Sequence, residues 1–156
     1  MQLETQKKFK LYLDTSVISA LFDSRNPERQ KLTKTFFSKI KSFSVFISVI
    51  TLAEVERTPN KKLQEQMEGI LAGHQVLSLT DNVNQLVKEY ISHKAVPEKH
   101  EPDAFHMAIA VVNEMDYLLS WNFKHLVREK TREVVNRVNT NKGLRKIKII
   151  TPAEIL

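Results

Sequence analysis

The sequence contains no cysteine, which excludes a disulfide framework and any metal site with thiolate ligands. No apolar run approaches the roughly 18 residues that a membrane-spanning helix needs, and the amino terminus has no hydrophobic stretch of signal-peptide length. With three glycines and five prolines, the sequence has no long flexible linker. We therefore predict a single domain over residues 1–156 that functions in the cytoplasm, away from membranes, with a flexible extension at residues 1–9.

Positive charge is concentrated near the carboxyl terminus. Residues 122–148 contain nine Lys or Arg against two Glu, a local balance of +7, whereas the whole chain carries +6. Such a cluster can supply the phosphate contacts that dominate binding to nucleic acid. A solvated helix face that keeps the protein soluble explains the same pattern. The sequence leaves both interpretations open.

Strands and helices are expected to alternate along the chain. Short β-branched and apolar segments predict strands at residues 10–14, 45–50, 76–80, 117–121 and 146–151. Helical spacing and helix-end signals predict helices at residues 15–22, 28–41, 52–57, 60–72, 82–93, 103–115 and 128–139. Strands joined by helical crossovers favour an α/β fold with a mostly parallel sheet that is covered on both faces. Its ligand site is expected at the carboxyl ends of the strands.

Three acidic residues stand at the junctions of these elements. Asp14 ends the first strand and is followed by Thr15 and Ser16, while Glu54 and Asp103 lie near the starts of two helices. Three carboxylates that come together repel one another unless a divalent cation neutralises them. Hard oxygen ligands favour Mg²⁺ or Mn²⁺ over Zn²⁺. These acids therefore predict a nuclease that depends on Mg²⁺ or Mn²⁺.

Each acid also has a purely structural interpretation. Asp14 is a favoured N-cap for the helix that follows it. Thr51 and Glu54 have the spacing of a capping box. Asp103 directly follows Pro102, and the helix dipole stabilises a carboxylate in a first helical turn. If capping were the only role, the three acids would lie apart and the enzyme hypothesis would fail.

Four segments, read together, resemble the PIN-domain family of metal-dependent ribonucleases, which includes the toxins of VapBC-type toxin-antitoxin pairs. They occur in the family's order at residues 12–18, 48–55, 103–108 and 117–126. The resemblance extends from about Lys10 to Leu156. It implies a three-layer α/β/α sandwich with a five-stranded sheet of order 3-2-1-4-5, in which the first and fourth strands are neighbours.

The resemblance also implies roles for individual residues. Asp14, Glu54 and Asp103 would hold Mg²⁺ or Mn²⁺ and, with Asn122, would form the catalytic site for hydrolysis of RNA phosphodiester bonds. Asn122 stands where the family has a fourth acid, and an amide lacks the charge to hold a second ion, so we expect one bound metal. The residues expected to support these acids or to contact substrate are Thr15, Ser16, Thr51, His106 and His125.

Two histidines and one tryptophan have alternative interpretations. His106 lies three residues after Asp103 on the same helix face, where it can bind that carboxylate, bind a substrate phosphate or pack beneath the site. His125 follows the fourth strand and is a candidate RNA contact. Trp121 can stack on a base or belong to the core.

The family resemblance implies two protein partners, a small antitoxin and a second copy of the chain. A stripe formed by Leu63, Met67 and Ile70 fits either a homodimer face or the core of a monomer. Two further functions stay open. One is a nucleic-acid-binding PIN-like module whose catalysis is weakened or lost because Asn122 replaces an acid. The other is a haloacid-dehalogenase-type phosphatase, which is disfavoured because that class requires a second Asp at the position of Ser16.

Overall fold

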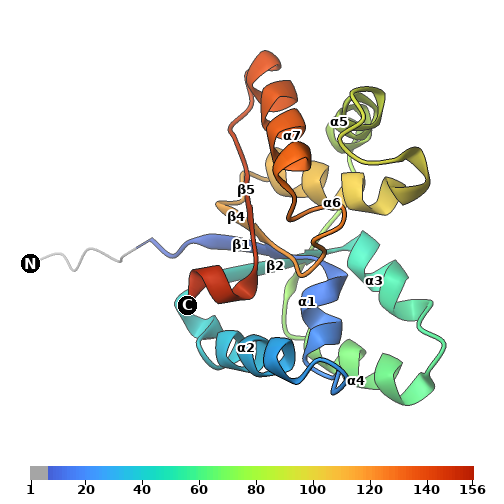
Figure 1. Cartoon of the computed structure of the whole chain (residues 1–156), viewed down its shortest axis with the longest axis vertical. Helices are drawn as coiled ribbons and strands as arrows, with labels where there is room; N and C mark the ends of the chain where they lie inside the picture. The colour runs from blue at the N-terminus through green and yellow to red at the C-terminus, as the bar shows by residue number, and fades with distance from the viewer. Residues whose placement is uncertain (1–6) are drawn as a thin grey trace, which may run out of the picture.

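Five parallel strands form one sheet between two layers of helices in the computed structural model, which describes residues 7–156 (Figure 1). The order along the sheet is β3-β2-β1-β4-β5, and every neighbouring pair is parallel. The strands are β1 (Lys10–Leu13), β2 (Ser44–Ser48), β3 (Gln75–Leu77), β4 (Tyr117–Leu119) and β5 (Lys148–Ile150). The predicted fold class and strand order are therefore confirmed.

The helices cover both faces of the sheet. Figure 1 shows α5 (Asp81–Ser92), α6 (Glu101–Val112) and α7 (Glu129–Asn141) on one face and α1 (Thr15–Ala20), α2 (Pro27–Ser38) and α4 (Lys61–Leu71) on the other. Helix α3 (Val49–Glu56) follows β2 directly and packs against α1, α4 and α6. Three short 3₁₀ turns complete the fold, at η1 (Ile40–Ser42), η2 (Glu98–His100) and η3 (Pro152–Ile155).

Alternation along the strands divides the core into two apolar clusters. Tyr12 packs with residues of α5, α6 and α7, whereas Leu11 and Leu13 pack with residues of α1, α2 and α4. Leu118 and Leu119 of β4 divide in the same way. Successive strand side chains point to opposite faces, so a sheet covered on both faces needs apolar residues at nearly every position. This explains why the central strands read as continuous apolar runs.

The end of β2 differs from the prediction. The predicted strand continues through Ile50, but α3 begins at Val49 and is capped by Ser48, whose hydroxyl accepts a hydrogen bond from the Ile50 amide at 3.1 Å. Thr51 therefore lies inside the helix, and the predicted capping box with Glu54 is wrong. The cap at Ser48 prevails over the β-propensity of Val49 and Ile50.

Two alternatives raised by the sequence are resolved by burial. Trp121 is 8% exposed, packs in the cluster on the α1, α2 and α4 side, and donates from Nε1 to Thr33 Oγ1 at 2.9 Å. Trp121 is therefore a core residue.

Met67 is 2% exposed, and Leu63 and Ile70 pack against the same cluster. The stripe on α4 thus serves the core, and the homodimer remains a prediction without support from it.

The predicted amino-terminal extension falls partly outside the described residues, since residues 1–6 are not among them. Phe9 belongs to the edge of the fold, because its carbonyl accepts a hydrogen bond from the Ser44 amide at 2.9 Å and its ring packs edge-on against Tyr117. Within residues 7–156, no helix has the length and apolar character required to cross a membrane.

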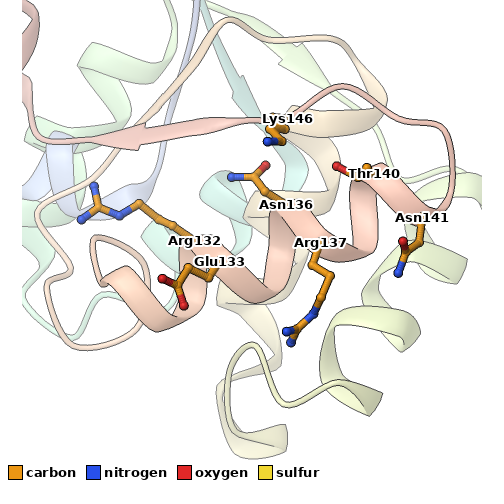
Figure 2. A pocket seen from close by; sticks show the side chains of 7 residues that line it. All are labelled: Arg132, Glu133, Asn136, Arg137, Thr140, Asn141 and Lys146. Atoms are coloured by element: carbon orange, nitrogen blue, oxygen red, sulfur yellow. The ribbon is translucent and has the colours of Figure 1, made fainter.

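Helix α7 covers the outer edge of β5 with polar side chains (Figure 2). Asn136 accepts a hydrogen bond from the Ile147 amide at 2.8 Å and donates to the Ile147 carbonyl at 3.1 Å. Arg132 donates from Nη1 to the Ile149 carbonyl at 3.2 Å. These bonds satisfy backbone groups that a further strand would otherwise pair.

We expect Asn136→Ala to lower the free energy of unfolding by about 1–3 kcal/mol, because it leaves both polar groups of the Ile147 backbone without this partner. Urea unfolding followed by circular dichroism measures the change. Asn141→Ala, at an exposed position on the same helix, serves as the matched control. Equal stability of the two variants would contradict a role for Asn136 in covering the edge.

Candidate functional site

Asp14 lies at the carboxyl end of β1 and has two structural roles. Its Oδ1 accepts hydrogen bonds from the Val17 amide at 3.3 Å and from the Ser16 hydroxyl, so the predicted N-cap of α1 is confirmed. Its Oδ2 accepts a hydrogen bond from the Ser120 hydroxyl, at the end of the neighbouring strand β4. The carboxylate is only 4% exposed. A cap alone does not explain this burial, because helix N-caps normally remain accessible to water.

Burial raises the pKa of the Asp14 carboxyl above its usual value. The nearby charge of His106 and the hydrogen bonds from Ser120, Ser16 and Val17 lower the pKa, but they only partly offset desolvation. Ionised Asp14 is therefore under-compensated in this structure. A cation beside it would stabilise the charged form.

Glu54 is held by contacts from two other elements. Its Oε1 accepts a hydrogen bond from Thr15 Oγ1 at 2.9 Å and lies 2.6 Å from His106 Nε2. Thr15 and Ser16, which follow Asp14 directly, thus contact different acids. Burial raises the pKa of Glu54, but the hydrogen bond and charge of His106 outweigh burial and hold it below its ordinary value.

His106 is a buried imidazole between α3 and the sheet. It is 2% exposed, and its Nδ1 is hydrogen-bonded to the Tyr12 hydroxyl, which in turn is hydrogen-bonded to Ser48 Oγ at 2.7 Å. Burial lowers the pKa of His106, but Glu54 and the charges of Asp14 and Asp103 raise it overall. His106 and Glu54 therefore form an ion pair. Of the three alternatives for His106, the structure agrees with packing beneath the site: the ring is buried and contacts Glu54 on α3, not the Asp103 carboxylate.

Asp103 lies in the first turn of α6, opposite Asn122. The Asn122 Nδ2 donates to Asp103 Oδ1 at 3.4 Å. The Asn122 Oδ1 accepts hydrogen bonds from the Lys124 and His125 amides at 3.2 and 3.0 Å. Asn122 thus presents an N–H group to the acid while its oxygen holds the turn after β4. An amide in this orientation positions Asp103 and offers no oxygen to a cation.

The three acids influence one another electrostatically. Burial raises the pKa of Asp103 to about 6, and the negative charges of Asp14 and Glu54 add to the effect, against the lowering influence of His106 and Asn122. Ser120 Oγ also links the two sides of the site, since it donates to Asp14 and accepts from the Asn122 amide at 2.9 Å. Hydrogen bonds through Ser120 and Asn122 thus link Asp14 to Asp103, and Thr15, next to Asp14, contacts Glu54, so the three acids belong to one network, here called the acidic cluster.

Hydroxyl and imidazole groups hold these carboxylates at separate points within the cluster. Among the side chains of residues 7–156, the metal-ligating set whose donor atoms all lie within 4.8 Å of one another is His100, Asp103 and His125, and it contains only one of the three acids. The sequence analysis did not identify His100, because its position becomes informative only when the turn after β4 is placed beside α6.

Tyr12 and Ser120 are further site residues that the sequence analysis missed. Tyr12 reads as a core residue, and its ring does pack in the core, but its hydroxyl reaches the network through His106 and Ser48. Ser120 ends the fourth strand as Asp14 follows the first. Since these strands are neighbours in the predicted order, the pairing of Ser120 with Asp14 was accessible from the sequence.

Two predicted supporting residues are buried rather than accessible to substrate. Thr51 is 0% exposed, and its hydroxyl has no hydrogen-bond partner within residues 7–156. His125 is 8% exposed, with its ring stacked on His100 at a centroid distance of 3.9 Å. Its predicted contact with RNA is therefore not favoured by its small exposed surface.

The basic carboxyl-terminal region borders a hollow elsewhere on the molecule. Figure 2 shows this hollow, whose lining includes no acid of the cluster and consists of Arg132, Glu133, Asn136, Arg137, Thr140, Asn141 and Lys146. Arg132 and Arg145 donate to backbone carbonyls, so part of the positive charge has a structural use. Arg137 and Lys146 are exposed and remain suited to either interpretation of the basic cluster.

The raised pKa of Asp103 predicts a pH-dependent stability of the metal-free protein. Between about pH 4 and pH 6 the folded protein binds a proton that the unfolded chain does not, so stability falls as pH rises through this window. We expect Asp103→Asn to be more stable than the original chain at pH 7 by about 1–2 kcal/mol, after allowance for solvent screening at a partly exposed group. The advantage should shrink toward pH 4.

Urea unfolding in EDTA at pH 7, 5 and 4 measures this difference. Glu101→Gln is the matched control, because Glu101 is an exposed acid in the same first turn of α6 and experiences the same helix dipole. A loss of stability in Asp103→Asn at pH 7 would show that burial and neighbouring charges do not strain this carboxylate.

Comparison with known proteins identifies relatives of this architecture. The sequence model of the PIN domain matches residues 11–122. The VapC20 toxin of Mycobacterium tuberculosis, which cleaves the sarcin-ricin loop, superposes with a TM-score of 0.60 at 15% identity, covering 88% of this chain and 98% of that one. VapBC2 from Rickettsia felis, bound to a DNA fragment from its promoter, gives 0.59 at 13% identity, covering 90% and 97%.

A toxin-antitoxin complex from Klebsiella pneumoniae gives a TM-score of 0.56 at 17% identity, covering 74% of this chain and 88% of that one. At these identities the solved structures establish similarity of fold. No curated protein sequence matches the chain significantly.

Proposed function

Because the chain belongs to the PIN-domain family, we propose that it is an endoribonuclease that hydrolyses RNA phosphodiester bonds with the help of Mg²⁺ or Mn²⁺. The position of the acids supports this proposal. Asp14 and Asp103 lie at the carboxyl edge of a parallel sheet, beside the β1–β4 pair where the strand order reverses. In open α/β sheets, ligands bind at this switch point.

The observation that carries the proposal is the uncompensated charge of the acidic cluster. Asp14, Glu54 and Asp103 contribute three negative charges when ionised, and His106 contributes one positive charge through its ion pair with Glu54. Two negative charges remain, on carboxyls whose pKa values are raised by burial. A single divalent cation matches this charge, and carboxylate oxygens are the ligands that Mg²⁺ and Mn²⁺ prefer.

Asp14, Glu54 and Asp103 would hold this ion, directly or through water, because among the described residues their carboxylate oxygens do not all lie within 4.8 Å of one another. When bound, a divalent cation supplies two contributions to phosphodiester hydrolysis, a lowered pKa of a nearby water and stabilisation of the charge that builds up on the phosphate. The chain's own residues fix the acids. Ser16 and Ser120 orient Asp14, and Thr15 orients Glu54.

His106 and Asn122 tune the same acids without touching the reacting atoms. His106 keeps Glu54 ionised and fixes it through Tyr12 and Ser48, which belong to neighbouring strands. Asn122 directs its N–H group at Asp103, where a carboxylate would have added a further negative charge. This arrangement favours one bound ion over two in the acidic cluster.

We further propose that the enzyme is the toxin of a type II toxin-antitoxin pair, restrained by a small antitoxin that blocks the acidic cluster. The similarity in fold to VapC20 and to two toxin-antitoxin complexes supports this partner. A homodimer and a cytoplasmic location belong to the same proposal. The proposal does not specify which RNA is cut, because the choice of RNA depends on surface loops.

A nucleic-acid-binding module with weakened or lost catalysis is the second candidate. The orientation of Asn122 favours it, because the amide oxygen is engaged by the Lys124 and His125 amides and the fourth acidic ligand is missing. Both candidates bind RNA, and they differ in whether the bound RNA is cut.

Asp14→Asn is expected to reduce metal-dependent RNA cleavage by at least about 100-fold, since it removes a charge that the ion requires while it preserves the size of the side chain. Cleavage of a mixed RNA substrate is measured during titration with Mg²⁺ and with Mn²⁺. RNA binding by the same variant is measured by a filter assay and should change much less.

Asp116→Asn is the matched control, because Asp116 accepts a hydrogen bond from the Lys10 amide at the opposite, amino-terminal end of the strands. This variant should cut RNA at the rate of the original chain. Binding of RNA by the original chain without any cleavage at either metal would favour the module. Unchanged cleavage by Asp14→Asn would remove Asp14 from the catalytic site.

A further inference from the structure

A second cluster of potential metal ligands lies beside the acidic cluster and contains imidazoles as well as a carboxylate. His100 ends η2 immediately before α6, Asp103 lies one turn later, and His125 comes from the turn after β4. One donor atom from each side chain lies within 4.8 Å of the other two. Two sequence-distant segments therefore bring two imidazoles and one carboxylate to a single point.

His125 lacks the hydrogen bonds that a buried histidine normally makes. It is 8% exposed, and neither its Nδ1 nor its Nε2 has a hydrogen-bond partner among the described residues. A buried polar side chain without a partner costs free energy, and such groups in native proteins usually mark a missing ligand, ion or water. The lack of hydrogen-bond partners for His125 is an observation independent of the clustering of donor atoms.

The two imidazole rings are already arranged side by side. Their centroids lie 3.9 Å apart with an interplanar angle of 33°. With this ring placement, a nitrogen of each imidazole lies close to a carboxylate oxygen of Asp103, so one cation could take a ligand atom from all three side chains.

We propose that His100, Asp103 and His125 form a binding site for a divalent transition metal, with Zn²⁺ as the best-fitting ion. Two imidazole nitrogens and one carboxylate oxygen are a ligand set typical of Zn²⁺ sites that keep an open coordination position. In a tetrahedral Zn²⁺ site with bonds of about 2.0–2.2 Å, the ligand atoms lie roughly 3.3–3.6 Å apart, so the three donor atoms must approach one another by about 1 Å. Small rotations of the three side chains from their present spacing therefore suffice.

This site differs from the acidic cluster in the ions that it favours. Mg²⁺ prefers oxygen ligands, whereas imidazole nitrogens favour Zn²⁺ and related metals. The two sites share Asp103, so an ion at one changes the affinity of the other. The inference does not depend on the proposed nuclease activity, because metal binding is measurable without RNA.

The test uses the full-length protein, freed of metal with EDTA and titrated with Co²⁺, whose visible absorption bands report nitrogen and oxygen ligands. We expect saturable bands that Zn²⁺ abolishes by displacement and that a large excess of Mg²⁺ does not. His100→Ala and His125→Asn should each weaken Co²⁺ binding at least about 10-fold. Circular dichroism verifies that each variant is folded.

Two controls separate this site from other sources of binding. His93→Ala removes an exposed histidine that lies 3.8 Å from Glu89 on α5, and it should leave the Co²⁺ titration unchanged. Asp14→Asn removes an acid that is not a ligand of the proposed site; it changes the charge around the shared Asp103 but should leave the bands in place. Loss of the bands in Asp14→Asn, with retention in both His100→Ala and His125→Asn, would assign Co²⁺ to the acidic cluster and overturn the proposal.

NMR of the original chain supplies a measurement that requires no variant. Addition of Zn²⁺ should shift the imidazole C–H resonances of His100 and His125 together and leave that of His93 in place. Failure of the His100 and His125 signals to respond to Zn²⁺ would equally overturn the proposal.

Discussion

The ion pair between His106 and Glu54 is the interaction on which the acidic cluster depends. Removing an ion pair from water costs free energy, so such a pair contributes little to net stability. Its main effect here is on the charge and position of the neighbouring carboxylates. It introduces the positive charge that sits among three carboxylates, and it ties α6 to α3 across the end of β1. Without the His106 side chain, the negative charge of Glu54 would also be uncompensated, and it would repel the carboxylates of Asp14 and Asp103 in a region largely shielded from water.

The early start of α3 makes this pair possible. Because Ser48 caps the helix, Glu54 stands well beyond the first turn, where its side chain reaches the buried ring of His106. The Ser48 hydroxyl is also hydrogen-bonded to the Tyr12 hydroxyl and so contributes to both the backbone cap and the side-chain network. One serine thereby fixes the helix and the acid that the helix carries.

The mostly parallel α/β class was predictable because apolar strands alternate with helical crossovers, and Asp14 was predictable as an acid at a strand end. The strand order was implied only by the resemblance to the PIN-domain family. The partners of the site residues were not predictable. The pairing of His106 with Glu54, instead of Asp103, depends on which way one ring turns from α6. The orientation of the Asn122 amide depends on two backbone N–H groups in the following turn. Sequence spacing specifies the face of a helix, but it does not specify a rotamer or the contact between distant segments.

The polar cover that α7 places over β5 also bears on how this protein associates. Side chains of Asn136 and Arg132 occupy the backbone groups through which β5 would recruit a strand from another molecule. Growth of the sheet by intermolecular strand addition is thereby blocked on this side. Strand addition to this sheet is therefore left to the opposite edge at β3, which gives the fold a built-in resistance to fibre formation along β5.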